Sequence, residues 1–296
     1  MPAIERLSFR GRVVVVTGAG SGLGRAYALA LAAREAQVVV NGRRNDNVQE
    51  TVEQIHAAGG AAVASVADVG AAGAGIAVVE TALATWGRLD ALVNNAGVGH
   101  MSSADDFSSD AFDADLQVSL RGSLALSLAA WPHLKEGGSG RIVNTSSSSI
   151  FGIPHSIPYA TAKAALLGLT QALAQDGAAA RIRVNAVMPL AATEMNANLP
   201  DPELVRMFQD HFPVEEAAAL VLLLCHERAP ASGETYITGG GFTGRVGLVV
   251  SQGIREPGAG PESILEKIDR VRDLAGGHAP RSSGDARRFI VERLQS

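Results

Sequence analysis

Tyr159 and Lys163 have the spacing of an acid–base pair. If the chain is helical from Pro158 onward, residues four apart lie on one face of the helix, one turn from each other. A free tyrosine titrates near pKa ~10, too high for proton transfer at neutral pH, and a neighbouring ammonium favours the phenolate. The sequence therefore predicts that Lys163 lowers the pKa of Tyr159, so that Tyr159 can give and take a proton. A serine run beginning at Ser146 could supply a hydroxyl that holds a substrate oxygen.

A glycine-rich turn at Thr17–Gly24 follows a short apolar run and precedes a helical pattern. Its useful glycines are Gly18, Gly22 and Gly24, because Leu23 stands where a Gly-x-Gly-x-x-Gly pattern would end. Glycines at such a turn let a pyrophosphate approach the backbone and rest on the helix N-terminus. No Gly-Lys-Ser/Thr follows, which excludes a Walker A loop. The turn predicts a dinucleotide cofactor.

The end of the second apolar run indicates which dinucleotide binds. An acidic residue there would take the ribose hydroxyls of NAD, but the chain has Asn41 and Gly42, followed by Arg43 and Arg44. Guanidinium groups match phosphate with a fork of donors. We therefore expect NADP to be preferred, with NAD possible. The alternative is that both arginines are ordinary solvated charges.

Apolar runs alternate with helical patterns, which predicts an α/β fold with a Rossmann-like, doubly wound parallel sheet of about seven strands. The expected strands are 13–17, 37–41, 61–67, 89–94, 140–145, 181–188 and 235–238, and the expected helices are 22–34, 45–58, 75–86, 108–134, 159–178 and 213–226. Ligands of such sheets bind beyond the carboxyl ends of the strands. Polar residues gather at those ends, so we expect one cleft lined by Thr17, Asn41, Asp68, Asn94, the serine run and Pro189.

The pattern changes near residue 241. Residues 1–241 are predicted to form the dinucleotide-binding and catalytic domain, and residues 242–296 a helical C-terminal extension with helices at 261–274 and 285–294. The extension is either a surface segment packed on its own domain or a dimerisation arm.

Composition excludes several classes of protein. The net charge is -5 and no long basic run occurs, so neither nucleic acid nor an anionic membrane is an expected partner. The first apolar run is too short to span a bilayer, and neither end carries a secretory or peroxisomal signal. Cys225, the only cysteine, sits in an apolar run as a buried thiol, which with the missing signals predicts a cytoplasmic location. The seven histidines are scattered, and we expect no metal site.

The motifs occur in a familiar order: TGAGSGLG (17–24), Asp68-Val69, NNAG (94–97), the serine run, YATAK (159–163), and Pro189 with Thr193. Over residues 8–241 the chain resembles the short-chain dehydrogenase/reductase family. The resemblance implies that Tyr159 is the general acid and base, that Lys163 binds the nicotinamide ribose, and that a serine binds the substrate oxygen. The cofactor-binding residues predicted from the turn, the arginines and the resemblance are Gly18, Ser21, Gly22, Leu23, Gly24, Arg43, Arg44, Asp68, Val69, Asn95, Ala96, Gly97, Tyr159, Lys163, Pro189 and Thr193.

Two serines compete for the catalytic position. Counting forward from Arg141 favours Ser147, whereas counting back from Tyr159 favours Ser146. One step along a strand turns a side chain to the opposite face. We favour Ser147 and keep Ser146 as the alternative.

The chain departs from the resembled family at two positions. Ser119 replaces an asparagine that supports a proton relay to the lysine, and Leu190 replaces the glycine after Pro189. A closer likeness, in segments such as SLRGSLALSLAAW and GGGFTGRV, is to the (3R)-hydroxyacyl-CoA dehydrogenase part of peroxisomal multifunctional enzymes. That likeness is weak in residues 189–213, beside the expected substrate site.

These observations predict an oxidoreductase that transfers a hydride between NAD(P) and a secondary alcohol or ketone, with a 3-hydroxyacyl-CoA as the first substrate class. The alternatives are a 3-oxoacyl reductase and a steroid, polyol or sugar-acid dehydrogenase. An alternative of another class is a nucleotide-binding sensor or scaffold that has lost turnover. From the resemblance we expect a homodimer or homotetramer.

Overall fold

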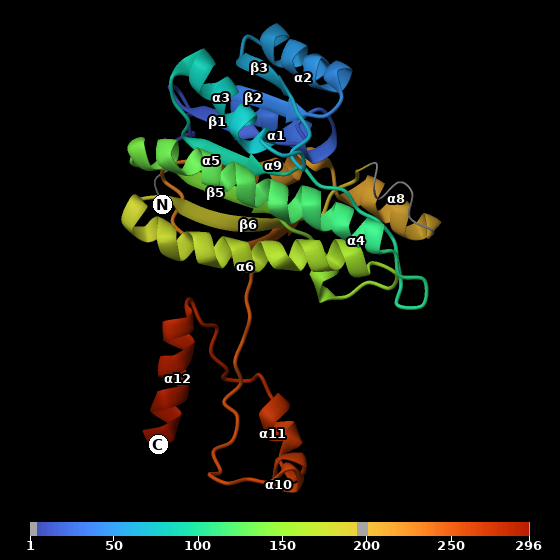
Figure 1. Cartoon of the computed structure of the whole chain (residues 1–296), viewed down its shortest axis with the longest axis vertical. Coiled ribbons are helices and arrows are strands. Elements are labelled where there is room, and N and C mark those ends of the chain that lie inside the picture. The colour runs from blue at the N-terminus through green and yellow to red at the C-terminus, as the bar shows by residue number, and fades with distance from the viewer. Residues whose placement is uncertain (1–4, 194–200, 296) are drawn as a thin grey trace. The chain divides into compact units, whose positions relative to one another are not determined.

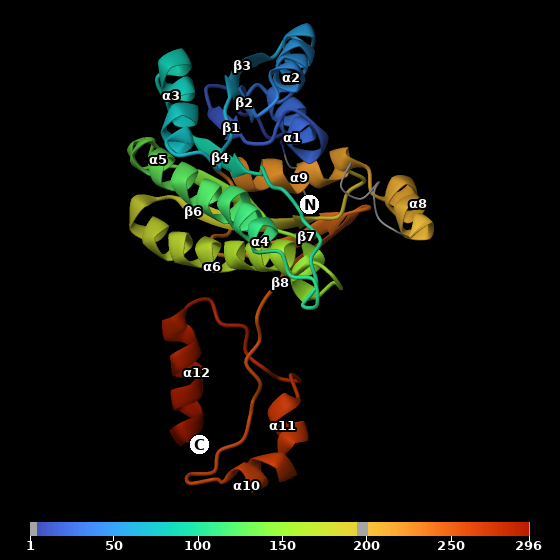
Figure 2. The same cartoon turned by 45° about the vertical axis from the view of Figure 1, so that its right-hand side comes forward.

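The computed structural model describes residues 5–193 and 201–295 (Figure 1). Its contacts divide the chain into two compact units, Met1–Arg245 and Val246–Ser296. The first unit holds the sheet and its helices, and the second holds three short helices. Figure 2 shows each unit from a second side.

An eight-stranded sheet forms the centre of the first unit, in the order β3-β2-β1-β4-β5-β6-β7-β8. Neighbouring strands from β3 to β7 pair in parallel. The strands are β1 Val13–Val16, β2 Gln37–Gly42, β3 Ala61–Val66, β4 Ala91–Asn94, β5 Arg141–Thr145, β6 Arg183–Pro189, β7 Thr235–Gly239 and β8 Phe242–Val246. The predicted parallel, doubly wound sheet is confirmed.

The count of about seven strands was one too low. Strand β8 follows β7 after Gly240 and Gly241, whose φ angles are +57° and +74°. Glycine adopts such angles without strain, and two consecutive positive φ values are what a tight hairpin turn needs. Because β8 joins the sheet, the division between the units falls after Arg245, four residues beyond the predicted boundary at 241.

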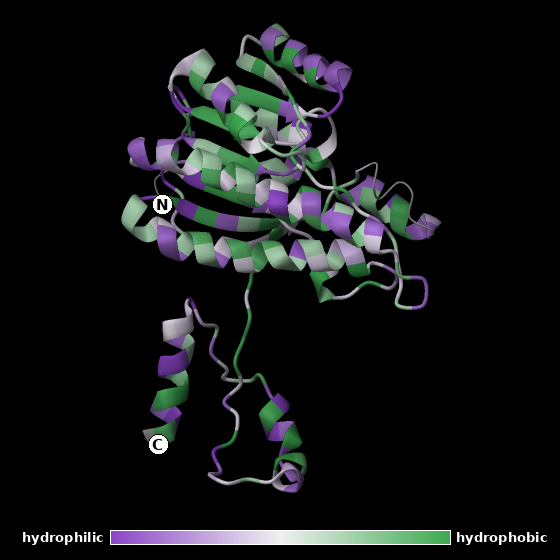
Figure 3. Ribbon diagram, in the orientation of Figure 1, coloured by the Kyte–Doolittle hydropathy of each residue, from purple (hydrophilic) through white to green (hydrophobic). Residues whose placement is uncertain are grey.

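Helices cover both faces of the sheet because its strands bury side chains on both sides. Val14 and Val16 pack with α1 (Gly22–Ala32), α2 (Asn45–Ala57) and α9 (Val214–Cys225). Val13 and Val15 pack with α3 (Ala74–Trp86), α5 (Ser123–Glu136) and α6 (Ile157–Ala180). Figure 3 shows the middle of the sheet in the hydrophobic colour, whereas α2 carries polar residues along its outer side.

The helix predicted over residues 108–134 is not one regular helix. It begins as α4 (Ser109–Asp115), continues as the π-helical segment η1 (Leu116–Gly122), and ends as α5. A short 3-10 helix, η2 (Ser148–Phe151), follows the serine run. Helix α8 (Pro202–His211) was not predicted; Asp201 caps it by accepting hydrogen bonds from the backbone N–H groups of Glu203 and Leu204.

The second unit contains α10 (Pro261–Glu266), α11 (Ile268–Arg272) and α12 (Ser283–Gln295). The single helix predicted over 261–274 is broken at Lys267. An isolated bridge joins Val250 to His278, whose ring stacks on Phe289 at 4.9 Å. Leu248 and Leu265 remain 84% and 70% exposed, so this unit leaves large apolar side chains uncovered. None of the described helices has the length and apolar character needed to cross a bilayer.

Candidate active site

The glycine-rich turn brings the start of α1 close to the end of β1. A Cβ added to Gly24 would lie 2.2 Å from the Gly18 carbonyl oxygen, so only glycine allows this approach. Gly18 has φ +63°, and a Cβ there would lie 3.0 Å from Cα of Ala96. Ser21 precedes α1 without capping it through its side chain, so the first backbone N–H groups of the helix keep their capacity to bind an anion.

Thr17 ties this turn to the end of β4. Its hydroxyl donates to the Val93 carbonyl at 3.3 Å and accepts the N–H groups of Asn95 and Ala96, each at 3.0 Å. In turn, the Asn95 Nδ2 donates a hydrogen bond to the Thr17 carbonyl oxygen at 3.0 Å. These hydrogen bonds join the NNAG segment to the glycine-rich turn, so that both form one wall of the site.

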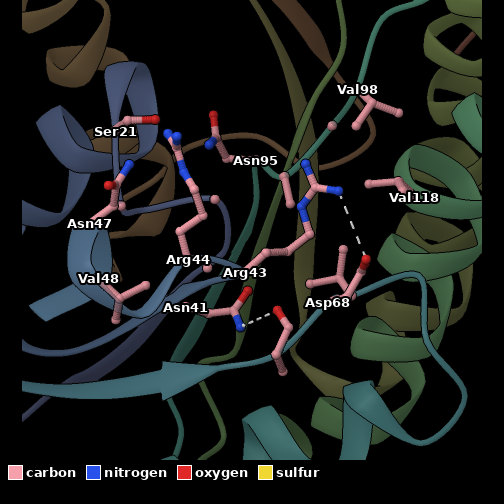
Figure 4. Close-up of a pocket in the computed structure, with 17 residues that line it drawn as sticks. Ser21, Asn41, Arg43, Arg44, Asn47, Val48, Asp68, Asn95, Val98 and Val118 are labelled. Carbon is pink, nitrogen blue, oxygen red and sulfur yellow. Dashed lines mark hydrogen bonds and ion pairs between the residues drawn. The ribbon is translucent and has the colours of Figure 1, made fainter.

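A cavity of about 560 Å³ extends from the turn across the ends of β2 and β3. Figure 4 shows Arg44 beside Asn47 and Ser21, and Arg43 reaching toward Asp68. The Arg43 Nη1 lies 3.9 Å from Oδ2 of Asp68, a distance that allows a weak ion pair. Both arginines line the cavity, and Asp68 is the one acidic residue among the described residues that line it.

The end of β2 carries no charge before Arg43, and its Asn41 is hydrogen-bonded to the neighbouring strand. Its fully buried Nδ2 donates to the carbonyls of Ser65 at 2.9 Å and Ala67 at 3.2 Å. The Asn41 amide is thus used within the sheet, and the next side chains along the chain are those of Arg43 and Arg44.

A second cavity of about 320 Å³ lies at the ends of β5 and β6. The two cavities share Ser21, Asn95 and Gly97, so they form one continuous cleft. The second is lined by Gly22, Leu23, Gly24, Ser146, Ser147, Tyr159, Lys163, Pro189, Leu190, Thr193 and Phe208, among others. The carboxyl ends of the strands meet here, as expected of an open parallel sheet.

Tyr159 and Lys163 share one face of α6, with the Lys163 Nζ 5.7 Å from the centre of the tyrosine ring. Nζ donates to the Thr145 carbonyl at 2.8 Å, and the side chain is only 4% exposed. Burial lowers the pKa of Lys163 to about 8, although the charge of Asp115 opposes this fall. The spacing prediction for the pair is met.

The predicted fall in the pKa of Tyr159 was wrong in direction. Burial raises the pKa, the hydrogen bond with Ser147 lowers it, and the charge of Asp115 raises it further. Desolvation of the phenolate outweighs the other influences because the phenol lies in a pocket largely shielded from water. Spacing in the sequence carries no information about this burial.

The two candidate serines have different surroundings. The Ser146 hydroxyl is 2% exposed and donates to the Lys163 carbonyl at 2.8 Å, which stabilises the start of α6. The Ser147 hydroxyl accepts the Ser149 N–H at 3.2 Å and forms the hydrogen bond with Tyr159. Ser147 is therefore the serine whose hydroxyl lies beside the phenol.

Sequence reasoning singled out Ser119 but missed the contact between Asp115 and His100. Asp115 has no exposed area, its Oδ1 lies 2.6 Å from Nδ1 of His100, and its Oδ2 accepts the His100 backbone N–H at 3.2 Å. Ser119 is also fully buried, and its hydroxyl has no hydrogen-bond partner within the described residues. No motif marks Asp115 or His100, because their contact depends on how the loop after β4 folds against α4.

Every predicted catalytic and cofactor-binding residue lines one of the two cavities, whereas Thr17 and Asn94, which were also expected in the cleft, line neither. The prediction missed Asn47 and Phe208. Asn47 could have been found, since it lies in the first turn of a helix directly after the two arginines. Phe208 could not, because α8 itself was not predicted. Within residues 5–193 and 201–295, no three His, Cys, Asp or Glu side chains gather as a metal site would require.

The family model described as short chain dehydrogenase matches residues 12–204. Peroxisomal multifunctional enzyme type 2 of Mus musculus is 36% identical over 304 residues, which cover 97% of this chain and 40% of that protein. A (2S)-[(R)-hydroxy(phenyl)methyl]succinyl-CoA dehydrogenase subunit of Thauera aromatica is 35% identical over 198 residues, 67% of this chain and 80% of that subunit.

A solved structure is similar to this chain as well. Full-length peroxisomal multifunctional enzyme type 2 from Drosophila melanogaster superimposes with a TM-score of 0.82 at 31% identity, covering 98% of this chain and 50% of that chain. This chain thus spans half or less of the length of both multifunctional relatives.

Proposed function

This chain belongs to the short-chain dehydrogenase family and is an NAD(P)-dependent oxidoreductase acting on CH–OH groups, and we propose that it prefers NADP and acts on 3-hydroxyacyl thioesters. One observation supports the activity: Tyr159, Lys163 and Ser147 line the same cleft as the glycine-rich turn. The cofactor preference and the substrate class have separate support and separate tests.

The turn fits a dinucleotide. The backbone is open at Gly22, where an added Cβ would meet nothing within 4 Å, and the N-terminus of α1 can accept the pyrophosphate. Asp68 and Val69 line the far end of the cleft for the adenine, while Pro189 and Thr193 line the end near Tyr159 for the nicotinamide. When bound, the cofactor supplies the hydride acceptor or donor.

We assign three roles at the reacting carbon. Ser147 donates a hydrogen bond to the substrate oxygen, and Tyr159 takes the hydroxyl proton during oxidation or returns it during reduction. Lys163, anchored on the Thr145 carbonyl, holds its ammonium near the phenol. This positive charge, together with that of the oxidised nicotinamide, opposes the burial that raises the pKa of Tyr159.

The sharpest test of the catalytic assignment is Tyr159→Phe. This variant removes the proton carrier and keeps the ring, so turnover should fall at least about a hundredfold while cofactor affinity changes little. A nucleotide-binding sensor without turnover would show no activity to lose. Unchanged turnover of a good substrate in the variant would remove Tyr159 from the mechanism.

The preference for NADP is supported by Arg43 and Arg44, which line the cavity beside a strand end that carries no carboxylate. Replacing both by alanine should weaken NADPH binding about tenfold or more and leave NADH binding nearly unchanged. Arg270→Ala, at an exposed arginine of the second unit, is the matched control. If the unaltered protein binds NADH tenfold tighter than NADPH, the preference proposed here is wrong.

The substrate class is supported by the Thauera aromatica relative, whose name assigns it an acyl-CoA substrate, and by Leu190 and Phe208 beside Tyr159. Nicotinamide absorbance should be followed with 3-hydroxyacyl-CoA, steroid, polyol and sugar-acid panels and both cofactors. We expect the acyl-CoA panel to give the highest kcat/KM. If a steroid or a sugar acid were the preferred substrate, the proposed acyl-CoA substrate class would be wrong, whereas the proposed hydride transfer would still hold. A cytoplasmic location and a homodimer or homotetramer remain further predictions.

A further inference from the structure

A third cavity lies at the edge of the sheet opposite the active-site cleft. It has a volume of about 380 Å³ and is lined by residues before β5, at the end of α6, at the start of β6 and before β7. Strands β5 and β6 begin here, at Arg141 and Arg183, and end at the cleft, at Thr145 and Pro189. No residue that lines this cavity lines the cleft, so the two are separate sites.

Three arginines line this cavity, and no acidic residue does. Arg141 and Arg183 are paired residues of the neighbouring strands β5 and β6, and Arg181 is the C-cap of α6. The described residues that line the cavity include no aspartate or glutamate. Like charges at paired positions repel each other, so this arrangement is destabilising unless a negative charge lies beside them.

Arg141 is the most buried of the three, with only 3% of its area exposed. Its guanidinium donates to three backbone carbonyls at 2.6–3.0 Å, which uses three of its five N–H groups. Burial, followed by the charges of Arg183 and Arg12, lowers the pKa of Arg141 to about 10. The carbonyls hold this guanidinium in place but do not neutralise its charge.

The nearby negative charges do not balance the three arginines. The Glu227 carboxylate is 62% exposed and lies 3.6 Å from another arginine, Arg12. The C-terminal end of α6 contributes only about half a negative charge. Within residues 5–193 and 201–295, the guanidinium groups of Arg181 and Arg183 have no hydrogen bond or ion pair. The cavity therefore carries a net positive charge.

Two serine hydroxyls add neutral donors to the same cavity. The Ser139 hydroxyl accepts a hydrogen bond from Nη1 of Arg12 at 3.1 Å, and the Ser232 hydroxyl accepts the Val184 N–H at 3.1 Å. Each O–H can still donate, since neither has an acceptor among the described residues. Guanidinium groups match the oxygens of phosphate with a fork of donors. The donors at this cavity thus suit an anion that has several oxygens.

We propose that this cavity binds a phosphate-type oxyanion, either inorganic phosphate or the phosphate group of a small ester. The anion neutralises the repulsion between Arg141 and Arg183 and thereby joins the starts of β5 and β6. It stabilises the folded protein without occupying the cleft. No step of hydride transfer depends on it, so this site goes beyond the function proposed above.

The test is thermal unfolding of the full chain while inorganic phosphate replaces chloride at constant ionic strength. The dinucleotide that binds more tightly is kept saturating, so that the glycine-rich turn is occupied. A ligand that binds only the folded state raises Tm, and at about ten times its Kd the rise should be about 3 °C or more. Glycerol phosphate is titrated in the same way: a larger rise than with inorganic phosphate assigns the site to an ester, and a smaller one to the free ion.

Two substitutions of Arg183 separate repulsion from binding. Arg183→Gln should have the same Tm as the unaltered protein in chloride, or a higher one, because the repulsion with Arg141 is relieved. In phosphate this variant should lose most of the rise in Tm. Arg183→Glu supplies the negative charge itself, so its Tm should be higher in chloride and should not respond to phosphate.

Two substitutions at exposed arginines complete the test. Arg181→Gln leaves the packing of the core unchanged and should also weaken the response to phosphate. Arg255→Gln, in the second unit, is the matched control and should keep the full rise. An equal rise in the unaltered protein and in the variants at positions 181 and 183 would refute the site, because phosphate stabilises any protein through its exclusion from the surface. No rise at all, or a rise that the saturating dinucleotide removes, would refute it as well.

Discussion

The buried ammonium of Lys163, which we assign to catalysis, lowers the stability of the folded protein. The residue is 4% exposed, and burial lowers the pKa of its ammonium from 10.5 to about 8. That difference corresponds to about 3 kcal/mol of cost for the charged form. The cost is full below about pH 8 and shrinks as the pH rises toward the unfolded value near 10.5, because the neutral form then predominates in both states.

Lys163→Met should therefore stabilise the protein at pH 7 while abolishing turnover. We expect a gain of about 1–2 kcal/mol in the free energy of unfolding, because the lost bond to the Thr145 carbonyl offsets part of the relief. Denaturant unfolding at pH 7 and pH 10 measures the gain, which should be smaller at pH 10. Lys135→Met, at an exposed lysine, should give no comparable gain. A less stable Lys163→Met protein at pH 7 would contradict this account.

Asp115→Asn should shift the pH profile of oxidation. The negative charge of Asp115 raises the pKa of both Tyr159 and Lys163, so removing it lowers both. Oxidation requires the pair to lose a proton, and its rate should then rise at lower pH than in the unaltered protein. The midpoint of kcat/KM against pH measures the shift, and it belongs to the coupled pair. A midpoint that moves upward would show that another charge controls the pair.

For single residues, spacing in the sequence was enough to predict that Tyr159 and Lys163 lie on one face of a helix, because residues four apart on a helix share a face. Spacing narrowed the serine to two positions, and the hydroxyls of Ser146 and Ser147 then proved to have different partners. It could not show the contact between His100 and Asp115. That contact forms only when the loop after β4 packs on α4.

Among the elements, η1 is the clearest departure from the helix that the sequence predicts. The residues of 108–134 have ordinary helical character, yet the helix widens to a π-turn at Leu116–Gly122. Serine hydroxyls bond back to carbonyls four residues earlier, from Ser123 to Ser119 at 2.6 Å and from Ser127 to Ser123 at 2.7 Å, which weakens a regular helix. Such segments are frequent at functional sites, and this one carries Ser119.

Gly24→Ala tests the close packing of α1 on the turn. The added methyl would lie 2.2 Å from the Gly18 carbonyl oxygen, so the helix or the turn must move. We expect a loss of about 2–3 kcal/mol in stability and much weaker cofactor binding. Thermal unfolding and cofactor titration measure both.

Gly168→Ala is the matched control for that variant. Gly168 lies inside α6, and an added Cβ would meet nothing within 4 Å. Alanine should stabilise the helix there by about 0.5–1 kcal/mol. If Gly24→Ala behaved as well as this control, the turn would not require glycine at that position.

At the scale of the whole chain, the parallel sheet was predictable because buried strands such as Val13–Val16 read as continuous apolar runs. Strand β8 was not predictable, since the residues of Phe242–Val246 are exposed or half-buried and include Gly244. The break at Lys267 in the second unit was also missed, because the apolar spacing on its two sides is continuous.

Ending the chain after Arg245 should leave a folded protein that binds cofactor, because every described cleft residue lies in the first unit. The second unit exposes Leu248, Leu265 and Leu274, which suits an arm that packs on a second copy. Sedimentation should therefore show fewer chains per assembly for the shortened chain. An equal number of chains per assembly for both proteins would support a surface extension instead.

Cys225 lies on α9 with no exposed area, and burial raises the pKa of its thiol to about 12. A thiol reagent can reach it only when α9 separates from the sheet, and there is no second sulfhydryl to confuse the signal. The rate at which Cys225 is labelled therefore measures how often α9 separates from the sheet. The labelling rate, measured with and without the dinucleotide, would report how strongly the ligand holds that face closed.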